Sequence, residues 1–581
     1  MNNLKTEWFD KVDRICPLND YPRPQFVRKD WMCLNGEYDY AITGDTELLP
    51  SVYEGKILVP FSIESELSGV GRALHPFERL WYRRYFTLDE SFTGKRAVLH
   101  FGAVDWECKV FINGKAVGSH TGGYNPFEFD ITDFLSDGEN ELIVRVFDPT
   151  DAGHQQRGKQ ILKPVGFWYT ATSGIWQTVW LEPVSDNRIN RVRITPDIDD
   201  NSVKFEFDVV GSGDITVSVC EDDNEIFSGK ADKELTVKIE NPKLWSPESP
   251  FLYDVKFSLN GGEDEVSSYF GMRKFSIVKD DSGIPRLALN NKPYFQRGLL
   301  DQGYWPESQL TAPTDEAMIF DISEMKRLGF NMLRKHIKEE PLRWYYHCDR
   351  LGMLVWQDMI SGGKPLNLIY AGAFPNINVH VKDNQYKAFN RDLPEWREEF
   401  EKEYKELIDN LYNCVSICTW VPFNEGWGQF DAKRIGEWTK KYDPSRLVDH
   451  ASGWHDQHGP DFKSVHKYIF PVHMPTSRRQ AGRPFVLSEY GGYSWNIEGH
   501  VWNYKRSFGY IQYKSEESLS KAYRKLHFDQ IIPLIKKGLS ATVYTQVSDV
   551  EFEVNGIFTY DRKVLKISED VLKECNEAMK Y

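Results

Sequence analysis

Hydrophobic positions along the chain follow two different periodicities. From about residue 31 to residue 278, short apolar runs alternate with polar positions and are separated by Gly, Asn, Asp and Pro, as in RLWYRRYFTL, ELIVRVFD and FLYDVKFSL. A period of two is typical of half-buried strands, and Asn113-Gly114 is a strong hairpin signal. After about residue 277, β-type runs alternate with stretches of helical periodicity. The sequence therefore predicts an all-β first part and an α/β second part.

The number and spacing of the predicted strands indicate three domains. Strands separated by turn residues predict a jelly-roll β-sandwich over residues 1–183, and a further series predicts an immunoglobulin-like β-sandwich over residues 184–278. Residues 279–581 contain a series of strand candidates with interposed helices that is typical of a (β/α)8 TIM barrel. The predicted fold class is thus multidomain, α/β plus all-β.

One polar pair follows a predicted buried strand. The segment VSICTWVPFNEGWGQF, residues 415–430, begins as an apolar run and ends with Asn424 and Glu425 among Trp and Phe residues. An amphipathic helix predicted over residues 395–411 leads into it. Because burial disfavours the charged form of a carboxyl group, we expect a raised pKa for Glu425, as a general acid requires. Taken alone, a solvated loop glutamate is an equal alternative.

A second glutamate occupies an equivalent position later in the chain. In RPFVLSEYGGYS, residues 483–494, a short apolar run ends in Glu489, followed by Gly491 and Gly492, which permit close approach of backbone or ligand. Two carboxylates at the exits of two buried strands are the pair that glycoside hydrolysis uses. This pairing favours a functional interpretation of both glutamates.

Other polar side chains also fall at the predicted carboxyl ends of barrel strands, where catalytic residues of such barrels lie. They are Arg297, Asp301, Arg334, His336, Asp358, Trp454, His466, Tyr468, Tyr544 and Gln546.

Composition narrows the classes of partner. The formal net charge is −15, which argues against nucleic acid, since phosphate binding needs a basic face. Aromatic residues make up 14% of the chain, which fits a carbohydrate binder as well as large β-rich cores. No long apolar run or leader-like start is visible, so we expect no membrane span and a cytoplasmic location, although a trimmed leader would leave no trace. The 8 cysteines lack a framework spacing and are expected to be reduced.

Several segments resemble glycoside hydrolase family 2, the group of β-galactosidases, β-glucuronidases and β-mannosidases. The resemblance covers nearly the whole chain and includes FINGKAVGSHTGGYNPFEFDITDFL, NPKLWSPESPFLYDV and RKHIKEEPLRWYYHCDRLGMLVWQDM. The NEG at Glu425 and the SEYGG at Glu489 match the family's acid/base and nucleophile motifs. By this resemblance Glu425 is the acid/base on strand four and Glu489 the nucleophile on strand seven.

The resemblance implies a retaining, exo-acting hydrolase of a terminal β-glycosidic bond. Two glutamates on strands four and seven can face each other across a narrow barrel mouth at the separation that retention needs. We expect Asn424 to bind the sugar 2-hydroxyl and Tyr468 to orient Glu489. The family carries a histidine after an Arg-x-Ser-His pattern; this chain reads Arg334-Lys335-His336, one residue shorter, and His336 is the matching candidate.

The remaining substrate-binding candidates have equal structural alternatives. Asp301 and Asp358 could hold hydroxyl groups or close salt bridges with neighbouring arginines, and Trp454 and Tyr544 could stack on a sugar or simply pack. His466 is a further candidate from its place at the end of a strand. We expect neither a metal ion nor a cofactor.

The identity of the sugar is predicted from one difference between this sequence and the β-glucuronidases of the family. β-Glucuronidases of the family carry an Asn-x-Lys pair before a GIFT segment, whereas this chain has Glu553-Val554-Asn555 there, which counts against glucuronides. We therefore predict a β-galactosidase. A plant-polysaccharide arabinoside or a β-mannoside is the alternative among enzymes, and a non-catalytic carbohydrate-binding protein is the alternative among classes. A glycoside is the expected partner, and a homo-oligomer is left open.

Overall fold

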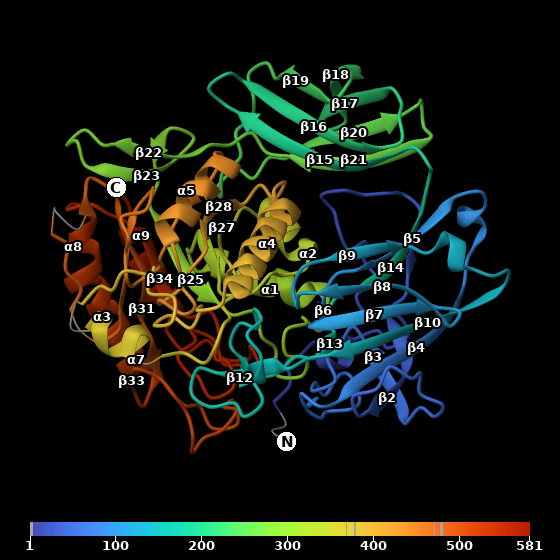
Figure 1. The fold of residues 1–581 in the computed structure, drawn as a ribbon. Coiled ribbons are helices and arrows are strands. Elements are labelled where there is room, and N and C mark those ends of the chain that lie inside the picture. Colours follow the sequence, from blue (N-terminus) through green and yellow to red (C-terminus); the bar gives the residue numbers. More distant parts are fainter. Residues whose placement is uncertain (1–3, 368, 377–378, 470, 477–479) are drawn as a thin grey trace.

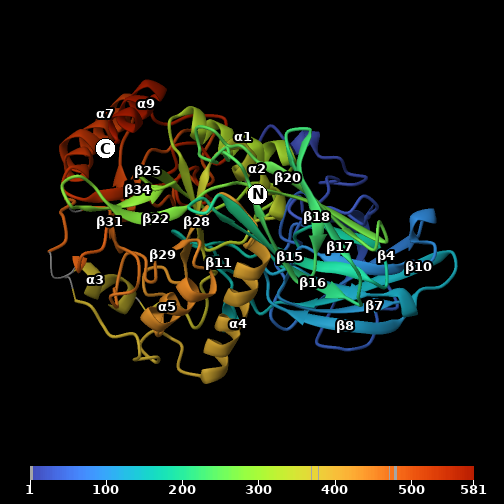
Figure 2. The ribbon, with the colours of Figure 1, turned by 90° about the horizontal axis from the view of Figure 1, so that it is seen from above.

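The computed structural model describes residues 4–367, 369–376, 379–469, 471–476 and 480–581. Figure 1 shows a jelly-roll sandwich (blue), a smaller sandwich above it (green) and an α/β barrel (yellow to red). Seen from above in Figure 2, the barrel lies to one side of the two sandwiches. The predicted fold class, with its three architectures, is confirmed.

The jelly roll consists of two facing antiparallel sheets. The four-stranded sheet has the order β1 (Met32–Cys33), β14 (Val179–Val184), β5 (Arg96–Phe101), β9 (Phe127–Asp130). The six-stranded sheet has the order β3 (Gly55–Val59), β2 (Gly36–Thr43), β4 (Arg79–Thr87), β10 (Glu139–Phe147), β7 (Glu107–Ile112), β8 (Lys115–Thr121). Alternate side chains such as Leu80, Leu99, Val110 and Val144 fill the space between the sheets and are fully buried.

The end of the jelly roll forms small pairings near the barrel. These are β6 (Val104–Asp105) with β13 (Gly174–Ile175), and β11 (Gln160–Ile161) with β12 (Tyr169–Thr170). Just before β11 the chain reaches the barrel, where Gln156 forms an antiparallel bridge with Gly362.

The second sandwich also has two sheets. One has the order β15 (Arg188–Asp197), β16 (Ser202–Val210), β19 (Glu234–Lys238); the other has the order β18 (Asn224–Ala231), β17 (Ile215–Glu221), β20 (Tyr253–Leu259), β21 (Asp264–Phe270). A sheet of β22 (Phe275–Lys279), β23 (Pro285–Leu289) and β24 (Lys292–Pro293) leads into the barrel. It lies across the predicted domain boundary at residue 279.

The barrel sheet contains all eight strands that the sequence predicts. In chain order they are β25 (Gln296–Asp301), β26 (Met332–Lys335), β27 (Leu354–Asp358), β28 (Ile417–Val421), β29 (Leu447–Val448), β30 (Lys463–Lys467), β31 (Phe485–Gly491) and β34 (Leu539–Thr545). Every ladder is parallel, and the first strand, β25, pairs with both the second, β26, and the eighth, β34, as barrel closure requires. Among the described residues, the ladder stops at β29 and β30.

Helices cover the outside of the barrel. They are α1 (Asp315–Arg327), α2 (Leu342–Leu351), α3 (Phe374–Asn376), α4 (Pro394–Leu411), α5 (Ala432–Tyr442), α7 (Glu516–Leu526), α8 (Ile532–Ile535) and α9 (Glu569–Ala578), and a further short pairing joins β32 (Tyr493–Ser494) to β33 (Ile511–Gln512). Thr314 caps α1 by accepting a hydrogen bond from the backbone N–H of Ala317. Within the described part of the chain, no helix combines the length and apolarity needed to cross a membrane.

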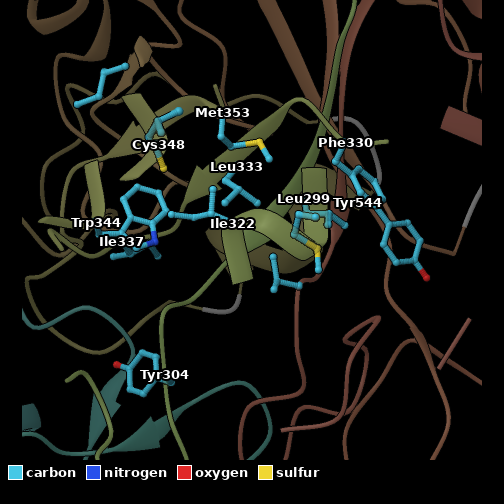
Figure 3. Packing of buried hydrophobic residues seen from close by; sticks show 14 of the residues in the cluster. Leu299, Tyr304, Ile322, Phe330, Leu333, Ile337, Trp344, Cys348, Met353 and Tyr544 are labelled. Atoms are coloured by element: carbon cyan, nitrogen blue, oxygen red, sulfur yellow. The ribbon is translucent and has the colours of Figure 1, made fainter. Parts of the chain in front are cut away.

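Buried apolar residues join the strands to this helical layer. Figure 3 shows Leu299 of β25 and Leu333 of β26 with Ile322 of α1, and Trp344 and Cys348 of α2. The segment before β1 packs on the same domain, because Trp8 meets Trp305 edge-on. The eight cysteines are free thiols, as predicted. This packing fixes the carboxyl ends of the strands, where the candidate site lies.

Candidate active site

A cavity opens at the carboxyl ends of the barrel strands. Barrel residues form most of its wall, and the jelly-roll segment between β11 and β12 closes one side. The lining residues are Lys159, Phe167, Trp168, Leu300, His336, Ile337, Leu366, Asn424, Glu425, Trp427, Tyr468, Glu489, Tyr510, Thr545 and Glu553. Both predicted catalytic glutamates therefore face one cavity.

Glu425 lies just beyond β28, in a short extended stretch that pairs with the residues after β29. Its backbone N–H donates to Ser452 O at 3.0 Å, and Ser452 N–H donates to Phe423 O at 2.8 Å. The backbone of Glu425 is in the left-handed region, with φ of +52°, a conformation that residues other than glycine rarely adopt. This turn projects the Glu425 side chain, which is one quarter exposed, into the cavity.

Glu489 lies within β31 and is almost completely buried. Gly491 and Gly492 follow with φ of +86° and +64°. A Cβ atom at Gly492 would lie 2.4 Å from the ring of Tyr510, so the absent side chain lets the aromatic wall close on the strand. The groups that approach these glycines are aromatic side chains, whereas the sequence predicted backbone or a ligand.

His466 of β30 joins the two carboxylates. Its Nδ1 lies 2.8 Å from Glu425 Oε1 and 3.6 Å from Glu489 Oε2. One ligating atom of each of the three residues lies within 4.8 Å of the other two, so one carboxylate oxygen of Glu425 and one of Glu489 are within that distance of each other. Within the described ranges this is the one cluster of three such groups, and its donor set would also accept a divalent cation.

Arg334 of β26 holds the carboxylate of Glu489 in a fixed orientation. Its guanidinium is fully buried and donates to Glu489 Oε1 at 3.0 Å, to Asn424 Oδ1 at 2.8 Å, and to both carboxylate oxygens of Asp358 at 2.9 and 3.0 Å. A buried guanidinium needs such partners, because one unpaired charge would be costly. The network therefore sets the orientation of Glu489 and of the Asn424 amide.

The pKa values of the two glutamates move in opposite directions. Burial raises the pKa of Glu425, and the nearby charge of Glu489 adds to this, against the hydrogen bond from His466. Burial also acts to raise the pKa of Glu489, but the charges of His466 and Arg334 outweigh it and leave that pKa below its ordinary value. Of the two glutamates, Glu425 therefore holds its proton to higher pH than Glu489 does.

Tyr468 donates its hydroxyl hydrogen bond to Glu489 Oε2, as expected from the sequence. Its ring stacks on Tyr510 with centroids 3.7 Å apart and planes 4° from parallel. Tyr510 thus holds Tyr468 in place, a role that the sequence did not indicate.

Asn424 and His336 also line the cavity, as predicted. Because the Asn424 carbonyl accepts from Arg334, its NH₂ group is what this side chain can offer a ligand. His336 Nδ1 lies 2.8 Å from Asp358 Oδ2, and burial, together with the charge of Lys159, places the pKa of His336 well below its ordinary value. Because Nδ1 of the neutral ring faces Asp358, Nε2 is the nitrogen that His336 can offer a ligand.

Two predicted aspartates lie behind the cavity wall. Asp358 is held by Arg334 and His336, and Asp301 accepts from Lys335 at 2.7 Å and from the backbone of Gly303 at 2.9 Å. Neither aspartate lines the cavity. Asp358 thus forms the expected salt bridge with Arg334, whereas Asp301 pairs with Lys335 and not with an arginine; contact of either aspartate with a sugar stays a prediction.

Neither aromatic candidate is among the residues that line the cavity. Tyr544 is fully buried against Tyr490 and Tyr523, so the packing alternative is correct for it. Trp454 lies beside His466 with ring centroids 6.0 Å apart and is outside the cavity lining.

Sequence reasoning missed the contribution of the jelly roll to the cavity. Trp168 meets Trp427 edge-on at 5.0 Å, and the Lys159 ammonium lies 3.9 Å from Glu553 Oε2. The hydroxyl of Tyr169 donates to the same Glu553 oxygen. In the sequence, only the glutamate at position 553, where β-glucuronidases of the family carry asparagine, was visible. Lys159 and Tyr169, which lie against Glu553 from the jelly roll, are hundreds of residues away in the chain.

Family models match the chain in three blocks. Residues 73–183 match the sugar binding domain of glycosyl hydrolases family 2, residues 187–273 match a second domain of that family, and residues 285–581 match its TIM barrel domain. The third match alone covers about half of the chain.

A β-galactosidase of Thermoanaerobacter pseudethanolicus is 28% identical over 391 residues, which is 63% of this chain and 47% of that protein. One from Pseudoalteromonas haloplanktis is 27% identical over 96% of this chain and 57% of its own length. The chain thus spans about half the length of these curated relatives.

Solved structures share the whole architecture at low identity. A β-D-glucuronidase of Dictyoglomus thermophilum has a TM-score of 0.75 at 18% identity and covers 96% of this chain and 98% of its own. A β-galacturonidase from Eisenbergiella tayi bound to galacturonate has a TM-score of 0.72 at 19% identity, with 96% and 100% covered. At this identity the likeness concerns the fold.

Proposed function

The chain belongs to glycosyl hydrolases family 2, and on this premise we propose that it is a retaining, exo-acting glycosidase that cleaves a terminal β-glycosidic bond. One observation supports the proposal above all: the carboxylates of Glu425 and Glu489 share a cavity and lie within 4.8 Å of each other. Retaining enzymes hold their two carboxyl groups about 5 to 5.5 Å apart, whereas inverting enzymes leave room for a water between them.

Glu489 is the proposed nucleophile. Its lowered pKa keeps it ionised, and the bonds from Arg334 and Tyr468 orient it toward the anomeric carbon. Attack forms a glycosyl-enzyme bond and breaks the bond to the leaving oxygen.

Glu425 is the proposed acid/base. Its raised pKa supports donation of a proton to the leaving oxygen, and the resulting carboxylate then removes a proton from the water that releases the sugar. The His466 ring lies close to both carboxylates, so it is positioned to stabilise whichever of the two glutamates is ionised at each step.

Substrate binding is assigned to Asn424 and His336. The Asn424 NH₂ group suits the sugar 2-hydroxyl, whose hydrogen bond strengthens in the transition state. His336, neutral and held by Asp358, offers a fixed nitrogen to another hydroxyl. The jelly-roll segment that closes one side of the cavity supports an exo mode, because a closed side admits only the end of a sugar chain.

A neutral sugar, with β-galactoside first, is the proposed substrate. The cavity wall carries three carboxylates, those of Glu425, Glu489 and Glu553, and one ammonium, Lys159, which already faces Glu553. A uronic acid would bring a further negative charge without an unpaired cation to meet it. An arabinoside or β-mannoside remains the alternative, and both glutamates weigh against a non-catalytic binding protein.

A panel of p-nitrophenyl glycosides tests this proposal. We expect release of nitrophenolate from the β-galactoside with at least about tenfold higher kcat/KM than from the β-glucuronide or β-galacturonide. Faster hydrolysis of a uronide would contradict the charge argument. Absence of turnover on every glycoside, with the protein folded, would favour the binding-protein alternative.

A further inference from the structure

Two cysteines meet where the amino-terminal segment, residues 4–31, crosses the jelly roll. Cys16 belongs to that segment and Cys33 belongs to β1. Their side chains are hydrogen-bonded to each other, with the Cys33 thiol as the donor. Both residues are half-buried, whereas five of the other six cysteines are buried. They are therefore a pair of thiols in contact with each other and open to a small reagent.

Neighbouring residues hold the two stretches of backbone together. The side-chain amide of Asn35 donates to Pro17 O at 2.9 Å. Gly36, with φ of +121°, permits a still closer approach, because a Cβ atom there would lie 2.4 Å from Ile15 O. The backbone on either side of the thiols is therefore held in place. A disulfide needs this, since it forms only over a narrow range of backbone separations.

A guanidinium group lies beside the pair. Arg84 Nη1 donates to Glu37 O at 3.3 Å, whereas the buried Nε has no hydrogen-bond partner among the described residues. Arg84 and Ile15 also line an open groove on the surface of the jelly roll. The hydrogen bond from Cys33, together with the charge of Arg84, lowers the pKa of Cys16 against the opposing effect of burial. Cys16 is thus the sulfur that ionises first.

We propose that Cys16 and Cys33 form a reversible disulfide by exchange with a low-molecular-weight disulfide such as oxidised glutathione. The Cys16 thiolate attacks one sulfur of the reagent, and one thiolate of the reagent leaves. Cys33 then loses its proton and attacks the Cys16 sulfur, and the second reagent thiolate leaves. The two released thiolates take up the two protons. Two protein thiols are thus oxidised while one small disulfide is reduced to two thiols.

The bond acts on the whole amino-terminal segment. This segment also contacts the barrel, where the backbone N–H of Thr6 donates to Glu307 Oε2 at 3.2 Å. A link between Cys16 and Cys33 closes a loop and restricts the segment in the unfolded chain, which favours the folded state. The disulfide therefore fastens a segment that packs on two domains.

Peptide mapping under non-reducing conditions tests the bond in the parent chain, without any variant. The folded full-length chain is incubated with oxidised glutathione near neutral pH and its remaining free thiols are blocked. We expect one peptide pair linked through Cys16 and Cys33. In Cys33→Ser, glutathione should stay on Cys16, because no second thiol displaces it. Cys220→Ser, in β17 of the second sandwich, is the control and should give the same linked pair as the parent chain.

Thermal unfolding tests the consequence of the bond. Oxidation should raise the unfolding midpoint by about 2 °C or more, and dithiothreitol should reverse the rise. Arg84→Gln should form the bond at least about threefold more slowly, because Cys16 loses the charge that favours its thiolate. Thiols that stay unreacted in the folded chain, glutathione that remains on Cys16 of the parent, a link to another cysteine, or an unchanged midpoint after oxidation would each overturn the proposal.

Discussion

One carboxylate oxygen of Glu425 and one of Glu489 lie within 4.8 Å of each other, although Glu425 follows β28 and Glu489 belongs to β31. Two acids this close cannot share one pKa, because ionisation of either disfavours ionisation of the other. Of the two glutamates, Arg334 and Tyr468 donate hydrogen bonds only to Glu489, and this asymmetry favours ionisation of Glu489. The proposed roles of acid/base and nucleophile thus follow from the different surroundings of two chemically identical side chains.

Glu425→Gln and Glu489→Gln should each lower kcat on a nitrophenyl glycoside by about 10³-fold or more. The two variants should differ with azide, a nucleophile that needs no general base. Azide should restore turnover of a dinitrophenyl glycoside in Glu425→Gln, because that substrate needs no acid to leave. Rescue of Glu489→Gln as a retained glycosyl azide would mean that the two roles are exchanged.

The pH profile of kcat/KM should be bell-shaped. Activity needs Glu489 ionised, so the acidic limb follows its lowered pKa; activity also needs Glu425 protonated, so the alkaline limb follows its raised pKa. His466 acts to lower both pKa values. In His466→Leu both limbs should therefore move to higher pH. Limbs that stay in place would show that His466 does not set these protonation states.

Tyr468→Phe should reduce kcat by about 10- to 100-fold, because the nucleophile loses a charge-assisted hydrogen bond. Tyr544→Phe is the matched control: it removes the same hydroxyl from a ring that packs in the core outside the cavity. Its kcat should stay within about twofold of the parent enzyme. Equal losses in the two variants would restore Tyr544 as a substrate contact.

Arg334→Gln should lower both stability and activity. Removing the guanidinium leaves Asp358 and Glu489 as buried carboxylates without their cation, a change that costs about 3–5 kcal/mol. Urea unfolding measures that loss. Asp358→Asn added to Arg334→Gln should recover part of the stability and none of the activity. A fully stable single variant would mean that water or a rearranged side chain replaces the pair.

Most of the fold could be predicted from the sequence because its signals are local. Strand period, the amphipathic face of α4 and the Thr314 cap each depend on neighbouring residues. The fifth barrel strand differs most from its predicted length, since β29 covers only Leu447–Val448. After Val448 the backbone leaves the ladder, and Ser452 pairs with Asn424, the residue before Glu425.

The candidate site was predictable only where its residues end barrel strands. Glu425, Glu489, His466 and Tyr468 satisfy that rule, because parallel strands end on one face of a barrel. The rule cannot distinguish a residue that lines the cavity from one behind its wall. It therefore allows both a hydroxyl contact and a salt bridge for Asp358. It also says nothing of Lys159, which reaches the cavity from another domain through a long-range contact.

The most direct test is to trap the intermediate. A 2-deoxy-2-fluoro glycoside of the sugar chosen from the panel should inactivate the enzyme, and peptide mass spectrometry should find one added glycosyl group on the peptide that contains Glu489. A glycosyl group on the Glu425 peptide, or turnover with inverted configuration and no adduct, would contradict double displacement through this pair.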